Sequence, residues 1–249
     1  MSFQFEKLNV PSAYQVVSRE LRRMILQGAL KTGHQLPTET QLAKQLGVNR
    51  STVREGIRQL ENEGLVRREG RKRLCVTVPD RRDLAPRAIR TLVMHQVTFR
   101  ELWEAALVLE PACASLCAAN HNDELLATLE SNLQQTRHVI GDTQRCTELD
   151  TEFHGIVAEG VHNKALLLSR EPIGLLLYSA FDRLCPLLPQ ASARMLGAHE
   201  QITRAIGEGD STEAARWMRK HIVDFRRGWE MAALSLDLPV DLPRVVADT

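Results

Sequence analysis

The chain has 249 residues, of which 43% are hydrophobic and 25% charged, with 32 Lys and Arg against 31 Asp and Glu. This length leaves room for two domains, and the composition is that of a globular protein rather than a disordered or fibrous one. Five cysteines without a CxxC pair argue against a disulfide framework or a zinc finger, and the apolar run 105–119 is too short to span a membrane, so we expect a cytoplasmic protein.

The near-zero net charge hides two unequal parts. Residues 1–80 carry 14 basic and 8 acidic side chains, a balance of +6, and the remaining residues carry 18 and 23, a balance of −5. Neutralisation of phosphate supplies much of the affinity of proteins for DNA. The amino-terminal part is therefore the candidate for DNA contact, and the acidic part is not expected to touch DNA.

The first predicted helix covers residues 14–30, with Gly28 near its end. Its apolar side chains recur at the three- and four-residue spacing of an amphipathic helix. This spacing predicts one buried stripe, consisting of Val17, Leu21, Ile25 and Leu26.

Two short helices are predicted within residues 36–69. Thr38 is the expected N-cap of the first and forms a capping box with Gln41, and Gly47 suits the left-handed position that ends it. Asn49 can cap the second helix. Two helices joined by so tight a turn match the helix-turn-helix pattern. The apolar positions are Leu42, Ala43 and Leu46 in the first helix and Val53, Ile57 and Leu60 in the second.

The second of these helices carries Arg50, Arg54 and Arg58 at four-residue intervals. Side chains at this spacing lie on one side of a helix. The planar guanidinium group can pair with two acceptors of guanine or with phosphate. We therefore predict that this face contacts DNA; the alternative is an ordinary solvated charged face.

A basic β-hairpin is predicted after this helix. Leu74, Val76 and Val78 alternate with other residues as in a short strand, and Gly70 lies at the tip. With the three helices, the hairpin forms a winged helix-turn-helix domain over residues 10–79. The basic side chains around the tip are Arg67, Arg68, Arg71, Lys72 and Arg73.

Residues 80–236 show long helical periods without strand alternation, which predicts an all-helical antiparallel bundle and makes the protein mainly α. Pro111 is expected to kink the second helix, and Pro172 to kink or split the fifth. Residues 237–249 are interpreted as a tail. The predicted helices are 81–95, 99–120, 122–140, 143–160, 164–185, 190–208 and 211–235.

One aspartate and three histidines of the bundle form a candidate metal site. Asp150 and His154 are four residues apart, so both emerge on one face of their helix. His199 and His221 lie on the last two helices, which could turn inward to meet them. Asp with His suits zinc, nickel, manganese or iron. By spacing alone, an Asp-His pair such as Asp150 and His154 is more often a surface hydrogen bond, and either distant histidine could be an ordinary satisfied side chain.

The amino-terminal part resembles the GntR superfamily of transcription regulators. The resemblance implies that Arg50, Thr52 and Arg54 contact DNA and that Gly70 approaches the minor groove; we add Arg58, Arg71 and Lys72. Two departures bear on operator specificity: Thr40 stands where FadR-type members often carry arginine, and the tip holds Arg71, Lys72 and Arg73. The matching residues are Ile25-Leu26-Gln27-Gly28, Gly33, Leu36-Pro37-Thr38-Glu39, Val48, Arg50, Val53-Arg54-Glu55 and Leu60 through Gly64-Leu65-Val66.

The bundle resembles the FCD effector domain of the FadR branch of that superfamily. The resemblance implies that one aspartate and three histidines, Asp150, His154, His199 and His221, hold a divalent metal, with zinc as the first candidate. Many FCD members carry an arginine where this chain has Ala106, and Arg194 is a candidate contact to an acidic effector or a plain surface arginine. The matching pieces are Leu109-Glu110-Pro111, Ala118-Ala119, Asp150-x-x-Phe153-His154, Asn163, His199-x-x-Ile202, Ala205-Ile206, Gly209-Asp210, Ala214-Ala215 and His221-Ile222.

The expected function is that of a ligand-responsive regulator. A homodimer would bind a near-palindromic double-stranded operator and repress a catabolic operon until a small organic or sugar acid binds at the metal. One alternative is a constitutive DNA-binding protein in which the metal is structural. Another is a metalloenzyme anchored to DNA, which the absence of an HExxH pair disfavours.

Overall fold

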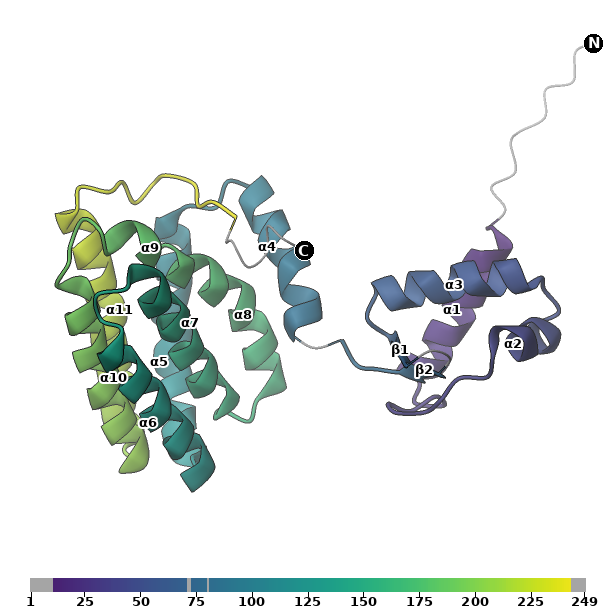
Figure 1. Ribbon diagram of the computed structural model, residues 1–249, viewed down its shortest axis with the longest axis horizontal. Helices are drawn as coiled ribbons and strands as arrows, with labels where there is room; N and C mark the ends of the chain where they lie inside the picture. The colour runs from purple at the N-terminus through teal and green to yellow at the C-terminus, as the bar shows by residue number, and fades with distance from the viewer. Residues whose placement is uncertain (1–10, 71–72, 80, 243–249) are drawn as a thin grey trace, which may run out of the picture. The chain divides into compact units, whose positions relative to one another are not determined.

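A computed structural model describes residues 11–70, 73–79 and 81–242 of the chain (Figure 1). The chain divides into two compact units, Met1–Asp83 and Leu84–Thr249. Each unit has its own hydrophobic core. As predicted, the protein is mainly helical, with a short β-hairpin in the first unit.

The first unit has the predicted three helices and wing. Its β-strands pair antiparallel, with Val66 opposite Val76. The fully buried side chains of Val53, Ile57 and Leu60 fix the long third helix against the other elements. The elements are α1 (Ala13–Leu26), α2 (Glu39–Leu46), α3 (Arg50–Asn62), β1 (Val66–Glu69) and β2 (Arg73–Val76).

The helix-turn-helix turn forms as the capping residues predict. The Thr38 side chain accepts a hydrogen bond from the Gln41 backbone, and the Gln41 side chain accepts one from the Thr38 backbone at 2.9 Å. Gly47 ends α2 with a left-handed φ of 67°. Asn49 occupies the N-cap position of α3 but makes no side-chain capping bond.

Two details of the predicted apolar pattern are wrong. Helix α1 ends at Leu26 because Gly28 adopts a left-handed φ of 75°, and Leu26 is 72% exposed in the last turn. Strand β2 buries Cys75 as well as its neighbours, since the strand also bridges to Gln35. Val78 lies beyond the strand and is exposed.

The second unit is the expected helical bundle, arranged around α5 (Figure 1). Helix α5 contacts α7, α8, α10 and α11. Among the described residues it is the one helix long and apolar enough to cross a membrane, yet half of that stretch is buried inside the bundle. The helices are α4 (Arg81–Met94), α5 (Phe99–Asn120), α6 (Asp123–His138), α7 (Thr143–Glu159), α8 (Lys164–Ser179), α9 (Phe181–Leu184), α10 (Ala191–Gly207) and α11 (Ser211–Met231).

The predicted helix 164–185 is two helices, and the split is not at its proline. Helix α8 continues through Pro172 to Ser179, and the chain breaks at Ala180 before α9. Helix α5 likewise continues through Pro111, which is buried in its core-facing side. A proline removes one backbone hydrogen bond, and packing of the neighbouring turns holds both helices across that gap.

The predicted tail begins as an ordered strap on the bundle. Backbone bonds join Val240 N to Val97 O at 2.9 Å and Arg100 N to Leu236 O at 2.9 Å. Arg100 also forms an ion pair with Asp237 at 2.7 Å. Residues 237–242 are therefore held against the start of α5, and residues 243–249 of the predicted tail lie outside the described residues.

Candidate metal centre and nucleic-acid interface

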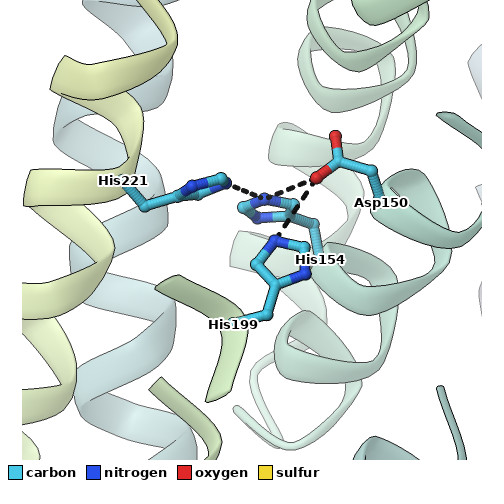
Figure 2. A group of neighbouring side chains, drawn as sticks. All are labelled: Asp150, His154, His199 and His221. Atoms are coloured by element: carbon cyan, nitrogen blue, oxygen red, sulfur yellow. Dashed lines mark hydrogen bonds and ion pairs between the residues drawn. The ribbon is translucent and has the colours of Figure 1, made fainter. Parts of the chain in front are cut away.

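The four predicted ligands meet inside the bundle (Figure 2). Asp150 and His154 emerge one turn apart from α7, while His199 comes from α10 and His221 from α11. All four are buried, and their ligand atoms lie within 4.8 Å of one another. The alternative of a surface hydrogen bond between Asp150 and His154 does not apply, because both residues face the core.

The distances leave polar atoms that need a partner. His154 Nε2 lies 3.2 Å from His221 Nε2, and Asp150 Oδ1 lies 3.3 Å from His199 Nε2. Asp150 Oδ1 and both ring nitrogens of His199 have no hydrogen-bond partner among the described residues. Buried polar atoms without partners are costly. A divalent metal such as zinc, held by this carboxylate and the three imidazoles, would give these atoms a partner. The four residues therefore fit a metal ion.

Burial also favours the protonation states of the imidazoles that metal binding requires. Loss of water lowers the pKa of His199 well below its usual value, and the neighbouring His154 acts in the same direction. Burial likewise lowers the pKa of His221, with a further contribution from His199. Neutral imidazole is the form that coordinates metal. Burial raises the pKa of Asp150, which makes a compensating cation beside this carboxyl favourable.

Two charged residues of the site are missing from the predicted ligand set. Glu110 Oε2 lies 3.0 Å from His154 Nδ1, and Arg170 donates from Nε to Glu110 Oε1 at 2.9 Å. Burial opposes ionisation of Glu110, but Arg170 and His154 outweigh it and hold its pKa at about 2. The position of Glu110 inside an otherwise apolar helical segment is a sequence signal that could have indicated its role in the site. In the sequence, Glu110 stands out otherwise only as part of the family pattern Leu109-Glu110-Pro111, and no motif or spacing indicates a role for Arg170.

Aromatic rings support two of the imidazoles. The His199 ring stacks on Phe153 at 3.7 Å between centroids, and the His154 ring stacks on Tyr178 at 3.9 Å. Phe153 belongs to the quoted family pattern, whereas Tyr178 was not identified from sequence. Stacked rings restrict rotation of the imidazoles, so the ligands are oriented before any metal arrives.

The predicted effector residue lines a pocket that reaches the ligands. This pocket, of about 30 Å³, is bordered by Asp150, His221 and Arg194 together with apolar side chains of α9, α10 and α11. Arg194 is partly exposed and paired with Asp224, which also borders the pocket. Ala106, at the position where many family members carry an arginine, is buried in the core and its methyl side chain supplies no cation.

The predicted DNA face of α3 is exposed. Arg50, Arg54 and Arg58 are accessible to solvent beside the buried apolar stripe, and Thr52 is half-buried. Gly70 is exposed with a φ of 66°, and a Cβ atom there would meet nothing within 4 Å. Arg71 and Lys72 lie outside the described residues.

An acidic residue at the start of α2 forms ion pairs with two arginines of this face and the wing. Glu39, with its side chain 16% exposed at the start of α2, accepts from Arg50 at 3.3 Å and from Arg68 at 3.4 Å. Arg68 also pairs with Glu61 at 2.9 Å. Arg54 has no ion pair among the described residues. Its guanidinium group is therefore free of intramolecular competition for an acceptor on DNA.

The chain is similar to known bacterial regulators. It is 30% identical over 164 residues to the HTH-type transcriptional regulator YdhC of Bacillus subtilis, covering 64% of this chain and 66% of YdhC. It is 26% identical over 223 residues to the Glc operon transcriptional activator of Escherichia coli, covering 84% and 85% of the two chains. It is 26% identical over 232 residues to the transcriptional repressor NanR of Klebsiella aerogenes, covering 86% and 84%.

The fold leads to the same group. A solved structure of Streptococcus agalactiae GntR matches with a TM-score of 0.64 and 26% identity, over 86% of this chain and 99% of that one. The family of bacterial regulatory proteins of the gntR type matches residues 13–76, and the FCD domain matches residues 101–224. These families and relatives are transcription regulators and not enzymes. The chain belongs to the GntR family of DNA-binding transcription regulators and carries an FCD effector domain.

Proposed function

We propose that this regulator is a repressor of a catabolic operon and that a carboxylated metabolite, a small organic or sugar acid, releases it from DNA. The observation that carries the proposal is the buried group of Asp150, His154, His199 and His221, because two of its members, Asp150 and His221, border a pocket that Arg194 also lines. A metal bound there would supply a Lewis acid for a carboxylate. Arg194 offers a second positive group to the same ligand.

The size of the pocket bears on how such a ligand would act. A space of about 30 Å³ has room for only two or three water molecules, since each needs about 10–15 Å³, so an organic acid requires the wall to move. The wall includes Phe181 and Leu184 of the four-residue helix α9. A ligand can shift DNA binding only if it favours one arrangement of the protein over the other. We propose that the two arrangements differ in whether this wall of the pocket is open or closed.

The proposed operator complex is a homodimer on near-palindromic DNA, acting in the cytoplasm. Two copies of α3 would enter successive major grooves, with Arg50, Arg54 and Arg58 facing the bases and phosphates. Arg50 and Arg58 are held by ion pairs of 3.3 and 3.5 Å, with more than half of each side chain exposed, so little free energy opposes their transfer to DNA. The two relatives differ in direction, since NanR is a repressor and the other regulator activates the Glc operon, so the proposal of repression rests on the family resemblance.

A ligand screen followed by DNA binding tests the proposal. The full chain is stripped of metal and heated with citrate, lactate, gluconate or galacturonate, each with and without Zn²⁺, Ni²⁺ or Mn²⁺. A ligand bound only by the folded state raises the unfolding temperature. We expect an acid that stabilises the protein only with metal and that weakens binding to an operator selected from random DNA.

Two other outcomes distinguish the alternatives. If metal stabilises the fold and no acid changes operator affinity, the protein is a constitutive DNA-binding protein with a structural metal. If an acid strengthens operator binding, the protein responds to a ligand but not as the proposed repressor. Arg194→Ala should weaken the response to the acid without changing metal affinity, and an unchanged response would remove Arg194 from the effector contacts.

A further inference from the structure

A buried ion pair adjoins the predicted metal ligands. Glu110 and Arg170 are 1% and 3% exposed, and Glu110 Oε1 lies 2.9 Å from Arg170 Nε and 2.7 Å from Nη2. Transfer of two charges from water into a protein interior is costly, and apolar residues of similar size often give an equally stable fold. Stability of the bundle alone therefore does not explain this pair.

The other oxygen of Glu110 determines how His154 presents its ring. Oε2 lies 3.0 Å from His154 Nδ1. An ionised carboxylate can only accept a hydrogen bond, so Nδ1 carries the proton. Nε2 then directs its lone pair toward His221 and Asp150 (Figure 2). A carboxylate behind a metal-binding histidine commonly has this role.

Helix α8 supports the arrangement with three residues at four-residue intervals. Arg170 supplies the cation for Glu110. Gly174 leaves room for it, because a Cβ atom at that position would lie 2.2 Å from Arg170 Nη2. Tyr178 stacks on the His154 ring at 3.9 Å, and its own ring lies 5.9 Å from the Arg170 guanidinium carbon. One face of α8 thus holds both the charge and the ring.

We propose that Glu110, held by this face of α8, is the positioning residue that sets the metal affinity of the centre through His154. The inference rests on the proposed metal role of the four ligands. His199 lacks such a partner: within the part of the chain that the structure describes, its Nδ1 has no hydrogen-bond partner. Stacking orients the rings of both His154 and His199, but Glu110 also fixes the position of the proton on His154.

A metal titration of single variants tests this role. The metal-free full chain is titrated with Zn²⁺ in competition with a chromophoric chelator, for the wild type and for Glu110→Gln. The amide keeps the shape of the side chain but removes the charge that fixes the proton on Nδ1. We expect zinc to bind about 10–100-fold more weakly to Glu110→Gln, the usual effect of losing such a partner.

The matched control is Glu171→Gln. Glu171 is a second carboxylate near Arg170, with a longer separation of 3.7 Å from Nη1, and it follows Arg170 directly on α8. Glu171→Gln should have a zinc affinity within about twofold of the wild type. It removes one negative charge near Arg170 but leaves the hydrogen bond between Glu110 and His154 in place. A decrease equal to that of Glu110→Gln would mean that net charge, not positioning, sets the affinity, and would overturn the proposal.

The possible results separate this inference from the proposed function. If the wild type binds no zinc, nickel or manganese, the proposed metal centre is wrong and this inference falls with it. If the wild type binds zinc and Glu110→Gln binds it equally well, only the positioning role is wrong. A purely structural ion pair would give that second result with a lowered unfolding temperature.

A measurement on the wild type covers the case in which Glu110→Gln does not fold. Long-range ¹H–¹⁵N spectra of the histidine rings report which nitrogen carries the proton. With Zn²⁺ bound, we expect His154 to keep its proton on Nδ1 and to coordinate through Nε2. Coordination through Nδ1 would overturn the positioning role.

Discussion

The DNA face of α3 and the buried centre of the bundle both depend on charged side chains, but they are built in opposite ways. Arg50 and Arg58 are mostly exposed and form long ion pairs of 3.3 and 3.5 Å with their neighbours. Asp150 and His154 are almost fully buried, and their polar atoms converge. Weak restraint suits a surface that must exchange partners with DNA, whereas burial and convergence suit a site that must hold one ion in a fixed geometry.

The largest expected effect is the loss of metal on removal of a buried ligand. His154→Ala or His221→Ala should strongly lower the zinc content and the effector response, because the loss of one of four donors weakens the site and leaves a coordination position to water. Operator binding without effector should stay within about twofold, since these residues lie in the other unit. Metal content by mass spectrometry checks this, with the exposed His138→Ala as control. Normal metal content in both ligand variants would refute the assignment.

The next effect concerns the DNA face. Arg54→Ala should weaken specific operator binding by about 5–150-fold, which corresponds to the 1–3 kcal/mol of a good base contact. The unfolding temperature should not change, since the guanidinium group is exposed and has no ion pair among the described residues. Fluorescence anisotropy with the operator measures the loss, and Arg19→Ala on the exposed side of α1 is the control. Equal losses in both variants would indicate a purely electrostatic effect.

A third effect is the pH dependence of the metal-free fold. Burial lowers the pKa of His199 and His221 in the folded state, so the unfolded chain binds more protons than the folded one below pH 6.5. The free energy of unfolding should therefore decrease as the pH is lowered below 6.5, by about 1.4 kcal/mol per pH unit for each histidine. Glu110, with a pKa of about 2, adds a further loss between pH 4.5 and 2.

Urea unfolding of the metal-free protein at pH 7.5, 6.5 and 5.5 measures this dependence. A His199→Asn variant should show a smaller slope below pH 6.5, because one of the two suppressed protonations is gone. An unchanged slope would assign the acid sensitivity to other groups.

The smallest expected effect compares two glycines within helices. Gly174→Ala should destabilise the fold by about 1–3 kcal/mol, because the added carbon would lie 2.2 Å from the Arg170 guanidinium, which the ion pair with Glu110 keeps in place. Gly197→Ala on α10 meets nothing within 4 Å and should stabilise the fold by about 0.5–1 kcal/mol. Urea unfolding checks both. The same sign for the two variants would show that the Arg170 side chain moves freely.

Local patterns predicted most of the first unit. The capping box at Thr38, the left-handed Gly47 and the apolar stripe of α3 are each written in a few consecutive residues, and all three are confirmed. The errors lie where a neighbour outside the pattern matters. Leu26 is exposed because it is the last residue of α1. Cys75 is buried because the segment at Gln35 forms a β-bridge with it.

The bundle was predicted at the level of its helices but not of its contacts. Spacing and family resemblance together nominated Asp150, His154, His199 and His221, whose convergence needed three helices at the right rotation and separation. The partners behind them, Glu110 and Arg170, are 60 positions apart in sequence. No periodicity connects such residues, so their pairing could not be predicted.

The sequence by itself determined what each segment can form: helix ends, the exposed arginine face and the amphipathic periods, because these depend on neighbours within a few residues. Only the tertiary structure decided which side chains share an interior, because burial, imidazole protonation and the ion pair of Glu110 with Arg170 depend on packing between distant helices. The α3 face is thus a product of local periodicity, and the buried centre is a product of the whole bundle.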